Sequence, residues 1–106
     1  MAFEIRIVSS DRLEIYLSGD LDINSSPELK IKSLEAYREN PKDICFDCTN
    51  LNYLDSTGLG ALISVYRNIN PQGHKLIIKN AKDHIMKLFY ITELDRDFIL
   101  EAEEKR

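Results

Sequence analysis

The stretch that decides the fold reads Asn50-Leu51-Asn52-Tyr53-Leu54-Asp55-Ser56-Thr57-Gly58-Leu59-Gly60. It lies between a β-rich run and a run, from Leu59 to Tyr66, in which apolar residues recur at helical spacing. Ser56 and Thr57 are both favoured N-cap residue types. The stretch therefore predicts a strand-to-helix loop, with a hydroxyl at its tip and a helix whose N-terminus points outward.

The bulk properties are typical of one compact domain. The chain has 106 residues and a formal net charge of −4, enough length to bury a core without disulfides or a structural metal. Its basic residues are scattered, so nucleic acid binding is not expected. No run approaches the roughly 18 apolar residues of a membrane span, and the first six residues lack a signal-peptide layout. We expect a cytoplasmic protein, a single domain over residues 1–106, that does not interact with membranes.

The only cysteines, Cys45 and Cys48, formally match a C-x-x-C motif. If their segment is a strand, residues three apart point to opposite faces, so the two sulfurs cannot share a metal or form a disulfide. A zinc site would also need His74 or His84, at separations that fit no standard pattern. We therefore expect buried thiols that behave as small hydrophobic residues.

The beginning of the chain predicts a hairpin. Apolar and polar residues alternate over residues 3–8 and again over Leu13–Ser18, as in antiparallel strands with one wetter face. In the second run Leu13, Ile15 and Leu17 should point inward.

Two helix-start signals overlap after the hairpin. Ser25 and Glu28 form a capping box, and Ser26 precedes Pro27, a favoured first helical residue. The helix should begin within a residue of Ser26. It should end at about Glu39, because the residue before the next proline disfavours helical backbone.

Strands and helices alternate in the rest of the chain. The predicted elements are a strand at Asp43–Cys48, a helix at Ser56–Ile69, a strand at Lys75–Lys79, a helix at Ala81–Ile91 and a strand at Phe98–Leu100. Helical crossovers join parallel neighbours, whereas the hairpin makes the first strand antiparallel. We therefore predict a small α/β domain of order ββαβαβαβ, with a mixed, mostly parallel sheet and three to four helices. Residues 101–106 should be a frayed tail.

Polar residues concentrate in two strand-to-helix loops, Gly19–Ser26 and Leu51–Gly58. Ligands and partners of parallel sheets gather at the carboxyl ends of the strands, where such loops lie. If the two strands are neighbours, acidic and hydroxyl groups meet at one end of the domain. The residues expected there are Asp20, Asp22, Asn24, Asp55, Ser56 and Thr57.

A hydrolase with Ser56 as nucleophile is disfavoured. A nucleophile elbow needs glycine where Leu54 stands. The candidate bases are His74, in a turn expected at the opposite end of the sheet, and His84, in the first turn of a helix. We expect no enzymatic activity.

The same loops suggest two binding functions, metal binding and phosphate binding. Asp20, Asp22 and Asp55 could ligate a metal, but loop aspartates more often serve as solvated turn and cap residues. Gly58 and Gly60 at a helix N-terminus could bind phosphate, but the full glycine-rich loop with its lysine is missing and Asp55 would repel an anion. We expect neither a metal nor a cofactor.

The remaining hypothesis is that Ser56 is a substrate. A serine at an exposed loop-to-helix junction is accessible to a kinase, and phosphorylation adds about −1.5 to −2 charge. Against one acidic group ~5 Å away, at an effective dielectric of ~20, each unit charge is repelled by about 3 kcal/mol, roughly a hundredfold in affinity. From the residues alone, Ser56 could equally be only an N-cap.

The segment Leu54-Asp55-Ser56-Thr57-Gly58-Leu59-Gly60 resembles the D-S-[ST]-G-[LI]-G signature of STAS domains, in particular those of bacterial anti-sigma factor antagonists. Residues 19–29 are similar to that family's G-E-[LIV]-D-x-x-[ST]-[AS]-P-x-L segment. Residues 89–94, followed by Phe98, resemble its closing helix. The resemblance covers essentially the whole chain, and it has two small departures: Asp20 replaces the commoner Glu, and Glu93 stands where Gly or Arg is usual.

The resemblance implies a regulatory switch. Such proteins, when unphosphorylated, bind an anti-sigma factor that is itself a serine kinase and thereby free a sigma factor. Phosphorylation of the motif serine, here Ser56, abolishes binding, and a serine phosphatase restores it. The partner-binding residues that we expect are Asp20, Asp22, Asn24, Ser25, Asp55, Ser56, Thr57 and Gly58.

An alternative within the same family is a STAS module that does not switch, acting as a scaffold or as a subunit of a lipid or anion transport system. The intact pair of Asp55 and Ser56 argues against it, because non-signalling relatives often lack a phosphorylatable residue there. Transport STAS domains are also commonly fused to a membrane portion.

Overall fold

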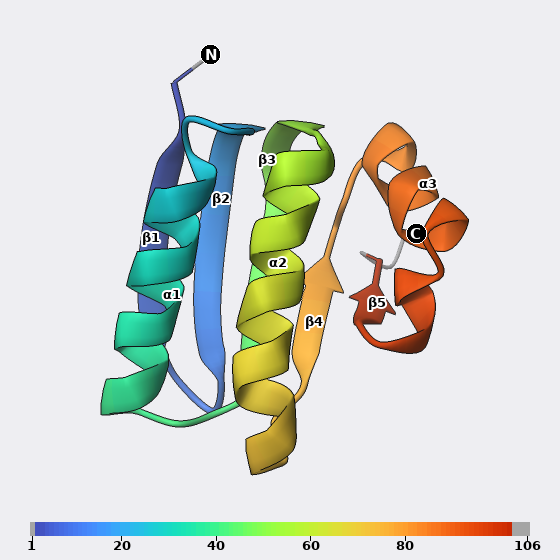
Figure 1. The fold of residues 1–106 in the computed structure, drawn as a ribbon. Helices are drawn as coiled ribbons and strands as arrows, with labels where there is room; N and C mark the ends of the chain where they lie inside the picture. The colour runs from blue at the N-terminus through green and yellow to red at the C-terminus, as the bar shows by residue number, and fades with distance from the viewer. Residues whose placement is uncertain (1, 103–106) are drawn as a thin grey trace, which may run out of the picture.

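Residues 2–102, which the computed structural model describes, are built around a five-stranded sheet whose spatial order follows the chain, β1-β2-β3-β4-β5 (Figure 1). The strands are β1 Glu4–Ser9, β2 Leu13–Leu21, β3 Ile44–Leu54, β4 Leu76–Lys79 and β5 Ile99–Glu101. The helices are α1 Ser26–Glu39, α2 Ser56–Ile69 and α3 Asp83–Ile91, with short 3-10 turns η1 at Asn70–Gln72 and η2 at Leu94–Arg96.

The strand directions follow from the connections. β1 pairs with β2 in antiparallel fashion through a short hairpin, and the pairs β2–β3, β3–β4 and β4–β5 are parallel because a helix lies in each connection. The predicted class, the order ββαβαβαβ and the antiparallel first strand are confirmed.

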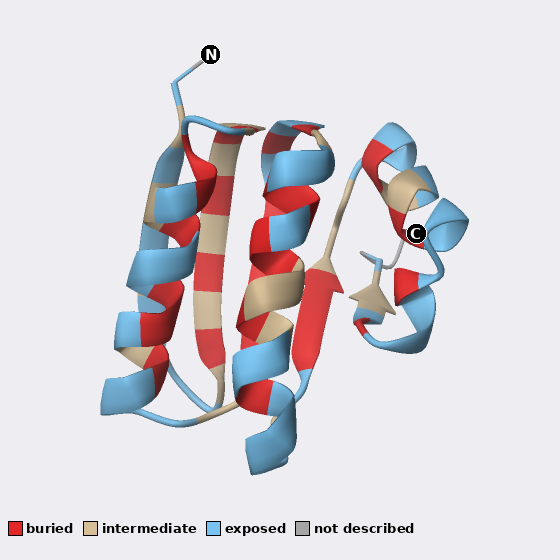
Figure 2. Ribbon diagram, in the orientation of Figure 1, coloured by how far each residue is buried: buried red, intermediate tan, exposed pale blue. Residues whose placement is uncertain are grey.

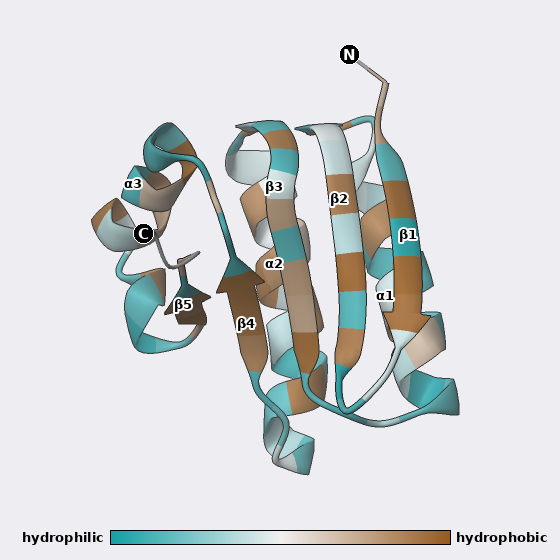
Figure 3. Cartoon of the chain, turned by 180° about the vertical axis from the view of Figure 1, so that it is seen from behind, coloured by the Kyte–Doolittle hydropathy of each residue, from teal (hydrophilic) through white to brown (hydrophobic). Residues whose placement is uncertain are grey.

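The core lies between the sheet and the helices. Figures 1 and 3 show α1 and α2 lying over one face of the sheet, and the burial bands in Figure 2 alternate along β2. Leu13, Ile15 and Leu17 are buried on that face, as predicted. α3 is connected to this layer through Phe98, whose ring makes edge contacts with both Phe89 and Tyr66.

Both β2 and β3 are longer than the sequence predicted. β3 continues past Cys48 to Leu54, and β2 continues past Ser18 to Leu21, so the two strands pair along their full length. Their register shifts twice, between Tyr16 and Ser18 and between Gly19 and Asp20. Such irregularities break the two-residue period, and from Cys48 onward the buried positions of β3 fall at residues 48, 51 and 54. A search for strict alternation therefore ends the strand too early.

The C-terminal elements differ slightly from prediction. α3 begins at Asp83 instead of Ala81, and β5 ends at Glu101, which is therefore part of the sheet and not of a frayed tail. The rest of the predicted tail, residues 103–106, lies outside the described residues. Glu93 has φ 61°, in the left-handed region that favours glycine, which explains why a glycine would suit this position.

The two cysteines lie on opposite faces, as predicted. Cys48 belongs to the hydrophobic core, whereas Cys45, which is paired with Glu14 of β2, does not. Figure 3 looks onto the face of the sheet that α1 and α2 leave uncovered. There Arg12 pairs with Glu14 at 2.7 Å and with Glu101 at 3.5 Å. Burial raises the pKa of the Cys45 thiol to about 12, and burial likewise raises the pKa of Cys48. Both thiols are free, buried and protonated at neutral pH.

Candidate functional site

The two polar loops meet at one end of the sheet. β2 and β3 are parallel neighbours, and Leu21 and Leu54 at their carboxyl ends are paired in register. The backbone N–H of Asp55 donates to the carbonyl of Leu21 at 3.4 Å, joining the two loops directly. α1 and α2 both begin at this end, which is the upper edge in Figure 1. The structure therefore brings the polar residues of the two loops together at this end of the sheet, as predicted.

The β2–α1 loop is held by its own side chains. Asp22 Oδ1 accepts hydrogen bonds from the backbone N–H groups of Asn24 at 2.9 Å and Ser25 at 3.3 Å. Ser25 Oγ donates to the carbonyl of Asp20 at 2.7 Å and accepts from the N–H of Asp22 at 2.9 Å. These bonds close the turn and leave Ser25 only 6% exposed.

The predicted capping box does not form. Ser25 occupies the N-cap position of α1, but its hydroxyl makes no capping bond because it is used within the loop. Glu28 instead pairs with Lys32 at 3.0 Å, one helical turn on. The buried Ser25 hydroxyl shapes the loop, and its expected contact with a partner stays a prediction.

Asp55, and not Ser56 or Thr57, caps α2. Asp55 Oδ1 accepts from the N–H of Gly58 at 3.0 Å, which is the N-cap bond to the third helical residue. Ser56 is the first helical residue, and it is exposed. Within residues 2–102 its hydroxyl has no hydrogen-bond partner. The prediction of a serine cap was wrong, and the correction leaves the Ser56 hydroxyl available for reaction.

Gly58 permits a close approach between α2 and β2. A Cβ at this position would lie 2.4 Å from the carbonyl oxygen of Leu21 and 2.8 Å from the side chain of Leu54. No side chain fits there, so the helix can begin against the strand only with glycine. Gly58 is itself buried, and its expected role in binding a partner stays a prediction.

The exposed surface of this end differs from the acidic one expected. Asn24, Ser56 and Thr57 are exposed, while Asp20, Asp22 and Asp55 are half-buried. Ile23 at the tip of the β2–α1 loop is 69% exposed, which was not predicted from the sequence. Its only sequence signal was an apolar residue inside a polar loop, outside any helical or strand period.

Neither histidine is in a position to activate Ser56. His74 Nδ1 shares a hydrogen bond with the hydroxyl of Tyr37 at 2.6 Å, beyond the amino end of β4. His84 lies in the first turn of α3, where Nε2 bonds to the carbonyl of Asn52 at 2.9 Å. In the part of the chain that the structure describes, no three His, Cys, Asp or Glu side chains are grouped so as to hold a metal ion.

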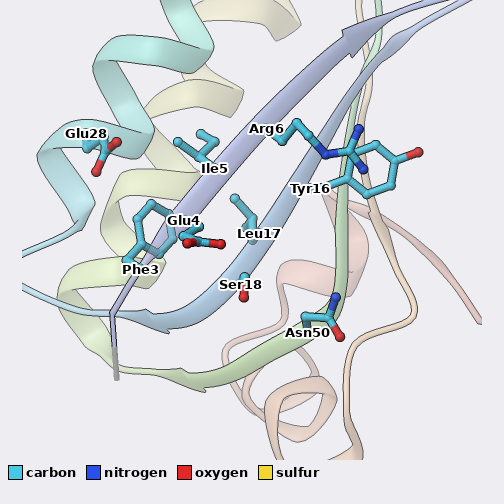
Figure 4. Close-up of a pocket in the computed structure, with 9 residues that line it drawn as sticks. All are labelled: Phe3, Glu4, Ile5, Arg6, Tyr16, Leu17, Ser18, Glu28 and Asn50. Atoms are coloured by element: carbon cyan, nitrogen blue, oxygen red, sulfur yellow. The ribbon is translucent and has the colours of Figure 1, made fainter.

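The described residues form several hollows. One of about 550 Å³ runs along β1 and contains no residue of the Ser56 motif; in it the Arg6 guanidinium stacks on the Tyr16 ring at 4.4 Å (Figure 4). A second, about 320 Å³, lies beside the β2–α1 loop and includes Asp20, Asp22 and Glu28. A third, about 330 Å³, lies between the first turns of α1 and α2.

Comparison with known proteins assigns the chain to a family. A sequence model of the STAS domain matches residues 3–106. The anti-sigma-B factor antagonist of Staphylococcus aureus is 32% identical over 95 residues, which span 89% of this chain and 88% of that protein.

Solved structures agree on the fold. An anti-sigma factor antagonist from Mycobacterium paratuberculosis superposes with a TM-score of 0.84 at 18% identity, covering 94% of this chain and 86% of the other. The Bacillus cell fate determinant SpoIIAA in its phosphorylated form gives a TM-score of 0.73 at 23% identity, covering 97% and 93%.

The chain belongs to the STAS domain family. The relatives named above are antagonists, which are regulatory binding proteins and not enzymes. None of the helices within residues 2–102 is long and apolar enough to cross a membrane.

Proposed function

We propose that this protein is a cytoplasmic anti-sigma factor antagonist that is switched by phosphorylation of Ser56. In its unphosphorylated form it binds an anti-sigma factor that is a serine kinase, and a sigma factor is released. The kinase modifies Ser56 and ends the interaction, and a serine phosphatase restores it. The observation that carries this proposal is the Ser56 hydroxyl, exposed at the first position of α2 and without a hydrogen bond within residues 2–102.

The local structure supports modification without refolding. Because Asp55 holds the cap of α2 through Gly58, the Ser56 hydroxyl can be esterified without breaking any hydrogen bond of the described structure. The added phosphate would stand at a helix N-terminus, where negative charge is favoured. The fold should therefore tolerate the phosphate, and the effect should appear at the interface.

Electrostatic repulsion then accounts for the switch. Phosphate adds about −1.5 to −2 charge to a surface whose other exposed members, Asn24 and Thr57, are neutral. One unit charge facing a partner carboxylate at ~5 Å, with an effective dielectric of ~20, is repelled by about 3 kcal/mol, or roughly a hundredfold in affinity.

The test uses the purified protein and the serine-kinase anti-sigma factors encoded in the same genome. Calorimetry should show binding by the wild type and by Ser56→Ala, and binding by Ser56→Asp that is weaker by roughly a hundredfold, the effect of one unit charge. Ser10→Asp, which adds the same charge in the β1–β2 hairpin, is the matched control and should bind like the wild type.

Incubation with ATP and the kinase, followed by mass spectrometry, should locate one phosphate on Ser56. Thr57→Ala should still be modified and Ser56→Ala should not. If no kinase of this kind modifies Ser56, the switch is refuted, and a STAS module that does not switch becomes the better description.

A further inference from the structure

The two glycines of the Ser56 motif differ in what the fold requires. Gly58 is needed because a Cβ there would collide with β2. Gly60 is helical, has no positive φ, and a Cβ at this position would meet nothing within 4 Å. Glycine inside a helix lowers stability relative to alanine, so folding alone does not account for Gly60.

Gly60 borders the hollow between α1 and α2. This hollow of about 330 Å³ is lined by Ser26, Pro27 and Lys30 of α1 and by Thr57, Gly60, Ala61 and Ser64 of α2. Its residues are continuous with the Ser56 surface through Thr57. A larger side chain at position 60 would fill the space, so glycine keeps the hollow open.

The polar groups of the hollow lack partners. Ser26 lines the hollow, and its hydroxyl makes no hydrogen bond within residues 2–102 although its oxygen is not fully buried. The hydroxyl is therefore free to donate to an incoming acceptor. Lys30 is exposed and, within the same residues, forms no ion pair, whereas its neighbour Lys32 is paired with Glu28.

The charge of the hollow selects an anion. Both α1 and α2 begin at this end, so both helix dipoles present their positive ends to it, and the Lys30 ammonium adds a full charge. Asp55, which would repel an anion, does not line the hollow, and its carboxylate accepts the N–H of Gly58. The hydroxyls of Ser26 and Thr57 can donate hydrogen bonds, while Pro27 and Ala61 offer carbon surface to the stem of a side chain.

We propose that this hollow receives a carboxylate side chain of the anti-sigma factor. The proposal rests on the function proposed above and adds the location of the acidic group that a phosphate on Ser56 would repel. Lys30 and the Ser26 hydroxyl bind the carboxylate, and Gly60 leaves room for its stem. Phosphorylation one residue from Thr57 places negative charge beside the occupied hollow and expels the partner.

Filling the hollow is the first test. Gly60→Leu should weaken binding to the purified anti-sigma factor by about tenfold or more, the size expected for a central interface contact. Gly60→Ala should weaken it less. Thermal unfolding should show that Gly60→Ala is no less stable than the wild type, because no atom within 4 Å opposes a Cβ, and it should show that Gly60→Leu remains folded at the temperature of the binding assay. Asn68→Leu, about 12 Å further along α2, is the matched control and should bind within about twofold.

Reversing the charge is the second test. Lys30→Glu should weaken binding by about tenfold, and Lys30→Gln should weaken it less, since it removes attraction without adding repulsion. A single Asp or Glu of the partner, changed to Lys, should restore binding of Lys30→Glu and thereby identify the occupant.

The outcomes separate the two proposals. If the wild type does not bind the anti-sigma factor, the proposed function fails. If the wild type binds and both Gly60→Leu and Lys30→Glu bind within twofold of it, the hollow is not the contact and only this inference is overturned. If Gly60→Leu alone weakens binding, the occupant is uncharged and the carboxylate is refuted.

Discussion

The two strand-to-helix junctions of the site use similar residues in different ways. Between β2 and α1 four residues, 22–25, form a loop that is closed by the Ser25 hydroxyl and the Asp22 carboxylate. Between β3 and α2 a single residue, Asp55, connects strand and helix and also caps the helix. In the first junction the serine hydroxyl forms the hydrogen bonds that close the loop. In the second junction a carboxylate caps the helix, and the Ser56 hydroxyl makes no hydrogen bond within the described residues.

This difference follows from how closely each helix approaches the sheet. The short junction brings the first turn of α2 against the backbone of Leu21, and Gly58 makes that contact possible. The longer junction keeps its tip, including Ile23, away from the core. At the β3–α2 junction the Ser56 hydroxyl is therefore exposed on a helix that is fixed against the sheet. At the β2–α1 junction the exposed loop around Ile23 provides a surface for contacts.

The largest expected effect concerns Gly58. Gly58→Ala should lower the free energy of unfolding by about 3 kcal/mol, because its Cβ would overlap the Leu21 carbonyl. Urea denaturation followed by circular dichroism measures this. Gly60→Ala is the matched control and should raise stability by about 0.5–1 kcal/mol. Equal changes in stability at the two positions would show that the close contact between position 58 and the Leu21 carbonyl does not limit the residue type there.

Ser25 should come next. Ser25→Ala removes the acceptor of the Asp22 N–H and the donor to the Asp20 carbonyl in a part-buried turn. We expect a loss of about 2 kcal/mol in the same denaturation experiment. Ser10→Ala, in the exposed hairpin, should change stability by less than about 0.5 kcal/mol. If Ser25→Ala is equally mild, the loop does not depend on its hydroxyl.

The cap of α2 is expected to contribute less. Asp55→Ala should lower stability by about 1 kcal/mol, the usual value for a lost N-cap. Asp55→Asn should retain most of it, because an amide oxygen also accepts the bond from the Gly58 N–H. A loss of the same size in Asp55→Asn would indicate that charge, and not capping, is what matters at this position.

The smallest change is expected at Ser56. Ser56→Ala should alter the free energy of unfolding by less than about 0.5 kcal/mol, because the hydroxyl makes no hydrogen bond within the described residues. A decrease of about 1 kcal/mol in the free energy of unfolding, comparable to that of Asp55→Ala, would show that Ser56 also caps α2. The two junctions would then use their serine hydroxyls in the same way.

Regular elements with strong local signals were predicted well. α2 has the predicted bounds, Ser56–Ile69, because its apolar stripe and the following proline are local features. α1 likewise begins at Ser26 and ends at Glu39. The far half of β3 was missed because its buried residues 48, 51 and 54 lie three apart, a spacing created by the irregular register with β2.

The sequence predicted which residues form the candidate site, but it did not predict the role of each residue. Neighbouring strands bring the named loops together, as expected from the order of the elements. The assignment of the cap, the burial of Ser25 and Gly58 and the exposure of Ile23 were not predicted. The burial of Gly58 depends on Leu21, which is distant in the sequence. The cap and the Ser25 bonds join near neighbours, but residue type alone does not report which of several neighbouring donors and acceptors the backbone brings within reach.

By itself, the sequence determined the order of the elements, the mixed sheet, the STAS family and the position of Ser56 at the start of a helix. Periodicity, turn residues and motif spacing are properties of neighbours along the chain, so they can be recognised without coordinates. The tertiary structure alone decided that Asp55 caps α2, that Gly58 is required where Gly60 is not, and that a hollow opens beside Lys30. These depend on how closely α1, α2 and β2 approach one another, and that distance is set by packing of the whole core.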